Sequence, residues 1–276
     1  MAASNQDRKL DKGTLLGLVL AVGGICGGLL LEGGSMREIA QPTAALIVFG
    51  GTLGATLVSQ PFRVFRDACR KLARIVFEER LDPHSVLAQI VEFSNKARRK
   101  GIVSLEKEIM AVADPFLKKA LILAVDGTEP QEIRRMMELE IALDESRADA
   151  EAGVWESAGG YAPTIGIIGA VLGLIQVMKH LENIEEVGKG IAVAFVATIY
   201  GVGVANLFLL PAAAKMKSVA RARQRISELA LEGVIGIAEG LNPKLIQNKL
   251  EAYLDNEPAA RPKKAPPAPP DAAAAA

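Results

Sequence analysis

Several common functional signatures are missing from this 276-residue chain. Its 32 basic and 32 acidic residues give a formal net charge of zero, which excludes a nucleic-acid-binding protein that relies on overall basicity. It contains no GxxxxGK[ST], HExxH or GxSxG motif. Neither of its two histidines, His84 and His180, has a metal-ligand pattern beside it. We therefore predict that the protein is not an enzyme, has no cofactor or metal site, and binds no nucleic acid.

Charge is also absent from four windows of the sequence, at 13–31, 39–62, 157–178 and 190–214. A helix that crosses the hydrocarbon core of a bilayer needs about 20 apolar residues, so each window can form one span. Residues 63–156, by contrast, hold 34 charges in 94 positions, and their apolar residues recur at helical spacing. This pattern predicts an all-α polytopic membrane protein with four transmembrane helices and a helical cytoplasmic domain.

The distribution of basic residues predicts the orientation of these helices. The two short loops, 32–42 and 179–189, hold only three Lys and Arg residues, whereas the other flanks are rich in them. By the positive-inside rule, both termini and the long charged domain are expected to be cytoplasmic. The predicted segments are a cytoplasmic N-terminus (1–12), a first hairpin (13–62, with spans near 13–31 and 43–62), the helical domain (63–156), a second hairpin (157–214, with spans near 161–178 and 190–211), a C-terminal helix (215–256) and a disordered Pro/Ala-rich tail (257–276).

Small residues recur three or four positions apart in every window, which lets helix backbones approach closely in lipid. They are Gly23, Gly24, Gly27 and Gly28 in the first window, Gly50 and Gly54 in the second, Gly166, Gly169 and Gly173 in the third, and Ala197, Gly201 and Ala205 in the fourth. Gly and Ala are also simply common in membrane helices. Their recurrence in all four windows favours close helix packing and is compatible with an oligomer.

No Asp or Glu lies inside any of the four windows. Proton pumps and ion-coupled carriers usually contain one, since a costly intramembrane carboxylate is retained only for function. If this protein conducts ions, the titrating group is expected to come from another chain. Thr164, Thr198 and Tyr200 are polar groups of the last two spans that could contact an ion or a carboxylate, although a threonine hydroxyl can equally bond the carbonyl four residues back.

Two prolines and a charged cluster admit both structural and functional interpretations. Pro163 is expected to open the third span and Pro211 to close the fourth, each as an ordinary helix end or as a hinge. The basic run 96–100 is followed closely by the acidic residues Glu106 and Glu108. Such charges form either a solvated face or a docking surface for a charged partner.

Taken together, these features resemble the MotA/PomA family of flagellar motor stator A subunits. The resemblance covers roughly residues 10–255. It is most specific in the stretches GGYAPTIGIIG at 159–169 and AFVATIYG at 194–201, the second running on to Ala205, Asn206 and Pro211. The segment GTEP at 127–130 and the spacing of Arg98 and Glu106 also match.

The resemblance implies a proton-channel assembly in the bacterial inner membrane. Five copies of such a subunit would surround two copies of a MotB/PomB-type B subunit, which would supply the missing intramembrane Asp. The third and fourth spans would line the ion path, with Thr198 beside that Asp and with Thr164 and Tyr200 on the same path. Pro163 and Pro211 match prolines that couple ion passage to cytoplasmic movement.

The same resemblance assigns the charged cluster to the rotor. Arg98 and Glu106 match residues that engage the rotor protein FliG, and Arg99, Lys100 and Glu108 are neighbours expected to take part. The expected function is therefore to convert ion flow into torque, and we favour H⁺ over Na⁺ as the ion. Three alternatives remain open at this point: an ExbB/TolQ-type energiser of another envelope machine, a transporter with its own substrate site, and a membrane scaffold without ion flux.

Overall fold

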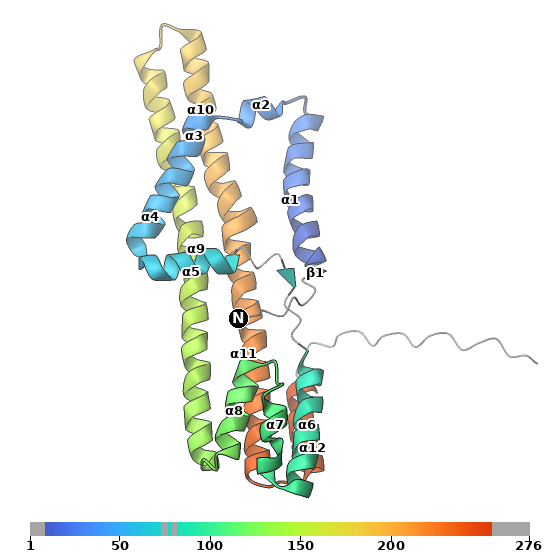
Figure 1. Cartoon of the computed structure of the whole chain (residues 1–276). Helices are drawn as coiled ribbons and strands as arrows, with labels where there is room; N and C mark the ends of the chain where they lie inside the picture. Colours follow the sequence, from blue (N-terminus) through green and yellow to red (C-terminus); the bar gives the residue numbers. More distant parts are fainter. Residues whose placement is uncertain (1–8, 73–76, 79–81, 256–276) are drawn as a thin grey trace, which may run out of the picture. The chain divides into compact units, whose positions relative to one another are not determined.

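Figure 1 shows the computed structural model, which describes residues 9–72, 77–78 and 82–255. The Pro/Ala-rich segment 257–276 lies outside the described residues, so its disorder stays a prediction. The described residues divide into two compact units, the first within 1–81 and 139–224 and the second within 82–138 and 225–276. Each unit is built around its own set of helices.

Four helical rods are long and apolar enough to span a membrane, and their apolar parts lie in the first unit. They are α1 (Lys12–Leu31); the run of α3 (Pro42–Ala45), the π-helical turn η1 (Leu46–Gly50) and α4 (Gly51–Ser59); the later part of α9 (Pro130–Lys179); and α10 (Ile184–Val204), which continues through the π-helical turn η3 (Ala205–Leu209) into α11 (Leu210–Ala238). The predicted all-α fold class is confirmed.

Shorter elements complete the first unit. Helix α2 (Met36–Ile39) lies in the first short loop, and α5 (Phe62–Leu72) follows the second span. Strand β1 (Lys9–Leu10) pairs antiparallel with β2 (Phe77–Glu78). A two-residue ladder is too short to produce a detectable alternation of polar and apolar residues, which is why the sequence did not reveal it.

The ends of the helices differ from the predicted spans in two places. The helix of the second span ends at Ser59 rather than near 62, because Gln60 precedes Pro61 and has an extended backbone. Pro163 does not begin the helix of the third span, as was predicted, because it lies inside the continuous helix α9. The change from charged to apolar residues near 157 marks a change of environment and leaves the helix uninterrupted.

The second unit is a small helical bundle. It contains α6 (Pro83–Lys100), the 3₁₀ turn η2 (Ile102–Leu105), α7 (Glu106–Ile109), α8 (Pro115–Val125), the first turns of α9, the last turns of α11, and α12 (Pro243–Asp255). Asp82 and Asp114 cap α6 and α8 by accepting bonds from the backbone N–H groups of His84 and Leu117.

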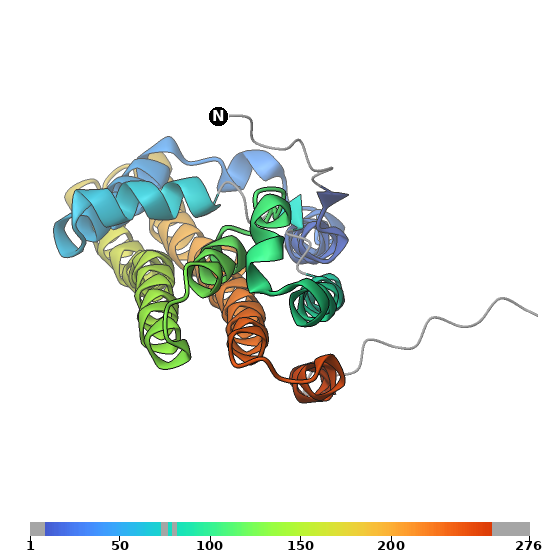
Figure 2. The same ribbon diagram turned by 60° about the horizontal axis from the view of Figure 1, so that its bottom comes forward.

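Apolar side chains from several of these helices form the core of the second unit. Ile90, Leu117, Ile133 and Leu250 are all fully buried. Gly233 brings α11 close to α6, since a Cβ atom there would lie 2.5 Å from Cγ2 of Ile90. Figure 2 shows the helices of this bundle largely end-on. Part of the predicted domain 63–156, residues 82–138, therefore shares a core with the C-terminal helices, whereas 63–81 and 139–156 belong to the first unit.

Candidate functional site

The third and fourth spans run side by side as a hairpin (Figure 1), and glycines lie at their contact. A Cβ atom added to Gly201 would lie 2.5 Å from the carbonyl oxygen of Ala162. One added to Gly166 would lie 2.9 Å from the carbonyl oxygen of Ala197. These neighbours are backbone atoms, which cannot move aside as a side chain can. The predicted close approach of small residues is confirmed for this pair of helices.

The two threonines of the predicted ion path bond to their own helices. Thr198 is half-buried, and its hydroxyl donates to the carbonyl of Ala194 at 3.2 Å. Thr164 is exposed, and its hydroxyl donates to the carbonyl of Tyr161 at 2.7 Å. Each hydroxyl oxygen keeps its acceptor capacity, because only its hydrogen is engaged. Both threonines can therefore still accept a bond from a protonated partner group.

Tyr200 has a structural contact that the sequence did not suggest. Its hydroxyl donates to the carbonyl of Ile39 at 2.5 Å and accepts a bond from the backbone N–H of Gln41 at 3.4 Å. Its ring also stacks on that of Phe49, with centroids 5.8 Å apart. Tyr200 thus fastens the fourth span to the beginning of the second, and both the donor and an acceptor position of its hydroxyl are occupied.

The two predicted coupling prolines are linked through one contact. Pro163 has no N–H, so it leaves the carbonyl of Gly159 without its usual helical partner. A Cβ atom on Gly159 would lie 2.6 Å from Cδ2 of Leu210. Leu210 directly precedes Pro211, so the turn of α9 that lacks one helical hydrogen bond lies against the residue before the second proline.

Pro211 follows the π-helical turn η3 and does not end the helix, which continues as α11. Proline cannot bond to the carbonyl four residues back, here that of Leu207, and its ring crowds that carbonyl. A wider turn accommodates this clash. π-helical turns are rare and often occur at functional sites, so this geometry favours the hinge interpretation over an ordinary helix end.

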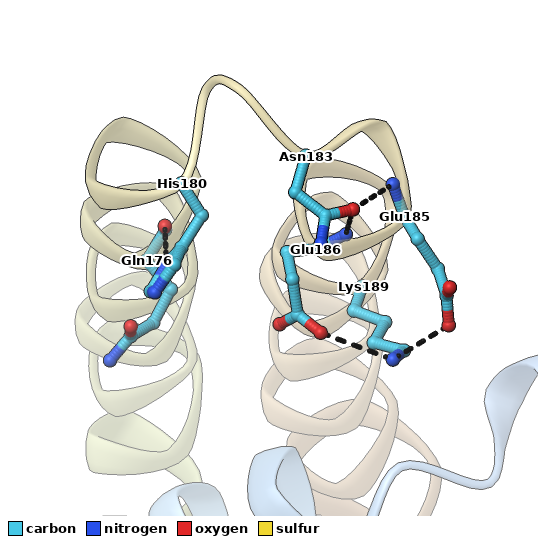
Figure 3. Close-up of polar contacts among 6 residues, drawn as sticks. All are labelled: Gln176, His180, Asn183, Glu185, Glu186 and Lys189. Atoms are coloured by element: carbon cyan, nitrogen blue, oxygen red, sulfur yellow. Dashed lines mark hydrogen bonds and ion pairs between the residues drawn. The ribbon is translucent and has the colours of Figure 1, made fainter.

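Figure 3 shows the polar contacts at the loop that joins the third and fourth spans. Asn183 caps α10 by accepting bonds from the N–H groups of Glu185 and Glu186. Lys189 pairs with both of these glutamates, at 2.9 and 3.2 Å. His180 bonds the carbonyl of Gln176 in its own helix. Each of these contacts lies within one helix or its cap, so they stabilise the two helix ends beside the loop. No metal-ligating group of three side chains occurs within the described ranges.

In the second unit, Arg98 and Arg99 line an open hollow of about 650 Å³ between α6 and α12. Lys244 and Gln247 of α12 line the same hollow, and no carboxylate does. Within the part of the chain that the structure describes, Arg98, Arg99 and Lys244 have no ion-pair partner. Three unpaired cations at one hollow are suited to an acidic partner surface.

The acidic half of the predicted rotor-binding cluster lies on α7, and its two glutamates differ. Glu108 accepts a bond from Lys96 at 2.6 Å, and Lys96 also pairs with Glu92 at 2.6 Å. These contacts, that with Glu108 first, raise the pKa of Lys96. Glu106 is exposed, has no such pair among the described residues, and does not line the hollow beside Arg98. Glu106 is therefore the more available acid.

Sequence reasoning missed three contributors to these sites. Lys244 is far from Arg98 in the sequence, and only the packing of α12 on α6 brings them to one hollow. The sequence shows Lys96 only as part of the basic run 96–100, whereas in the structure the glutamates on its own helix and on α7 engage it. Gly159 shows no local sign of its contact with Leu210. Each depends on pairing between distant segments.

Comparison with known proteins decides the family. Residues 108–230 match the MotA/TolQ/ExbB proton channel family, and residues 15–101 match the motility protein A N-terminal region. Motility protein A of Bacillus subtilis is 37% identical over 89% of this chain and 91% of its own length. This chain belongs to the MotA/PomA family. The chemotaxis protein PomA of Vibrio alginolyticus is 30% identical over 89% of this chain and 96% of its own length.

Solved structures agree with this assignment. The structure of C. jejuni MotAB matches with a TM-score of 0.85 and 32% identity, over 90% of this chain and 97% of that chain. The flagellar MotAB stator complex from Bacillus subtilis matches with a TM-score of 0.80 and 36% identity, over 88% and 96%. The fold of this MotA/PomA family member is therefore that of a stator A subunit across most of its length.

Proposed function

We propose that this chain is the A subunit of a flagellar motor stator. With a MotB/PomB-type B subunit in the bacterial inner membrane it forms an ion channel, and it converts ion flow into torque on the rotor. Its family, its four candidate spans and its similarity to MotAB stator complexes support this function. It acts as a channel subunit and catalyses no covalent reaction, and both of its termini are cytoplasmic.

The observation that carries the proposal is a closely packed helix pair with hydroxyl groups but no acid. The third and fourth spans meet through Gly166 and Gly201 and offer Thr198, yet no Asp or Glu lies within any apolar window. An intramembrane proton path needs a titrating group. That group is the Asp of the B subunit, and several copies of this chain, five by family resemblance, enclose a B dimer.

The coupling step begins when the ion neutralises the Asp of the B subunit. This removes a charge beside Thr198 and shifts the third span against the fourth. The contact of Gly159 with Leu210 carries this shift from Pro163 to Pro211 and the π-helical turn. Moving one charge through 100 mV releases about 2.3 kcal/mol, which is enough to bias such a step.

The proposed rotor-binding surface consists of the hollow lined by Arg98, Arg99 and Lys244, together with the exposed acid Glu106. FliG is the partner, and its charged surface complements both. Arg98→Glu is expected to reduce torque strongly and to be partly rescued by a reversed charge on FliG. The matched control is Arg147→Gln, an exposed arginine that pairs with Asp144. No rescue by any FliG charge would contradict direct docking at Arg98.

Motility of a bacterium without its own stators tests the whole proposal. The strain receives this chain and the adjacent B-type gene, and swimming speed is followed against external Na⁺ and a protonophore. Swimming that the protonophore abolishes and Na⁺ does not affect is the expected result. Speed that follows Na⁺ would keep the stator function and overturn the choice of H⁺. No motility, with both proteins in the membrane, would contradict the proposal.

A further inference from the structure

Helix α5 (Phe62–Leu72) rests on α9 where the apolar part of α9 begins. The indole N–H of Trp155 donates to the carbonyl of Ala68 at 3.3 Å, and the rings of Trp155 and Phe65 have centroids 6.3 Å apart. Trp155 lies two residues before the charge-free window that starts at 157. Figure 1 shows α5 running crosswise to α9. With the spans placed in a membrane, helix α5 lies at the boundary where the charged part of α9 meets its apolar part.

Three arginines form a stripe along the exposed side of this helix. Arg63, Arg66 and Arg70 are three and four residues apart, which places them on one face, and all three are exposed. The apolar residues Phe65 and Ala68, which contact Trp155, lie on the opposite face. The stripe therefore points away from α9, toward the medium that surrounds the unit at this depth.

The stripe holds more positive than negative charge. Arg66 and Arg70 share one carboxylate, that of Asp67, at 3.3 and 3.4 Å. Arg63 has no ion-pair partner in the described part of the chain. Three arginines and one carboxylate give the stripe a net charge of two positive units. The neighbouring Lys71, in contrast, has its own partner in Glu151.

We propose that Arg63, Arg66 and Arg70 bind the phosphate of an anionic phospholipid headgroup. Guanidinium groups pair with phosphate through two parallel hydrogen bonds, and basic residues beside a span attract anionic lipids. Phe62 begins the same helix and is 72% exposed, so it provides an apolar contact for the acyl boundary beside the cations. This site requires the membrane placement of the chain and does not depend on torque or on ion flow.

Retention of phosphatidylglycerol by the purified A–B complex tests this site. The complex is released from nanodiscs of mixed phosphatidylcholine and phosphatidylglycerol, and native mass spectrometry counts the anionic lipids that remain bound. The triple variant Arg63→Gln, Arg66→Gln, Arg70→Gln is expected to retain roughly tenfold less, because it loses the unmatched charge. The charge-preserving triple variant to Lys is expected to retain most of it, and Arg147→Gln, on an exposed paired arginine elsewhere, to retain all of it.

Three results would overturn the assignment. Equal retention by the Gln variant and the wild type would show that the stripe does not hold the lipid. Displacement of the lipid by an equal concentration of inorganic phosphate would make free phosphate the ligand. A changed number of subunits in the Gln complex would make the stripe a subunit contact. Thermal melting of each complex, expected to be unchanged, separates these results from misfolding.

Discussion

The first span and the second hairpin carry similar small-residue spacing and use it differently. In α1, a Cβ atom added to Gly23, Gly24, Gly27 or Gly28 would meet nothing within 4 Å, and no residue of α1 is buried. In the second hairpin, a Cβ atom added to Gly166 or Gly201 would lie within 3 Å of a backbone atom. The spacing alone therefore shows only that a helix can pack closely. Close packing occurs in this chain where the facing helix also has small residues.

Helix α1 is also attached to the rest of the unit by a different kind of contact from that within the second hairpin. Lys215 of α11 bonds the carboxylate of Asp11 and the hydroxyl of Thr14 at the beginning of α1. This polar contact lies at the N-terminal end of the helix. The second hairpin is held by backbone contact along its length, whereas α1 is fastened mainly at one end. The apolar face of α1 is left to lipid or to other subunits.

The largest expected effect comes from adding one methyl group to the close contact. Gly201→Ala would place a Cβ atom 2.5 Å from the carbonyl oxygen of Ala162, so the two helices must separate. We expect a loss of stability of roughly 1–3 kcal/mol and a loss of swimming. The measurement is thermal melting of the A–B complex together with swimming speed.

The matched control for this change is Gly24→Ala in α1, which has open space around it. It is expected to melt and swim like the wild type, or slightly better, because Ala favours a helix over Gly. Equal damage from both substitutions would contradict the distinction drawn between the two regions.

A smaller and more specific effect is expected from removing one hydroxyl. Thr198 and Thr56 both donate to a carbonyl four residues back in their own helices, but only Thr198 belongs to the proposed ion path. Thr198→Val is expected to lower ion flux roughly fivefold, the value of one hydrogen bond accepted from a protonated carboxyl, with assembly intact. Thr56→Val, in the first hairpin, is the control and is expected to leave flux unchanged. Normal flux and motility in Thr198→Val would contradict the role of its hydroxyl.

The sequence predicted the fold class and the approximate spans because these follow from local composition. Four charge-free windows sufficed to find four helices, whichever residues the helices contact. It placed Pro163 at a helix end, because a change in polarity is easily taken for a change in secondary structure. It could not distinguish the glycines of α1 from those of α9, since their spacing is alike. The bond from Tyr200 to Ile39 also joins segments too distant to infer.

The smallest expected effect concerns the polar attachment of α1. Hydrogen bonds, that from Lys215 first and that from Thr14 next, hold the pKa of Asp11 well below its usual range. A carboxyl whose pKa is lowered by folding stabilises the native state above its usual pKa and loses that effect as the pH falls. The attachment is therefore complete at neutral pH and weakens only in acid.

Lys215→Gln is expected to loosen the beginning of α1 without unfolding the complex. Faster amide hydrogen exchange in the first turns of α1 at neutral pH, with α10 unchanged, is the predicted result. Lys217→Gln is the control, because it breaks a comparable pair with Glu156 elsewhere in the same unit. Unchanged exchange at the start of α1 would show that Lys215 does not fasten it.

The central claim is that this chain lines an ion path but lacks the group that titrates in it. Proton flux into liposomes tests this most directly, with this chain alone, with its B subunit, and with a B subunit whose intramembrane Asp is changed to Asn. We predict flux only for the complex with the intact Asp, and a further loss of that flux in Thr198→Val. Proton flux through this chain alone would contradict the claim.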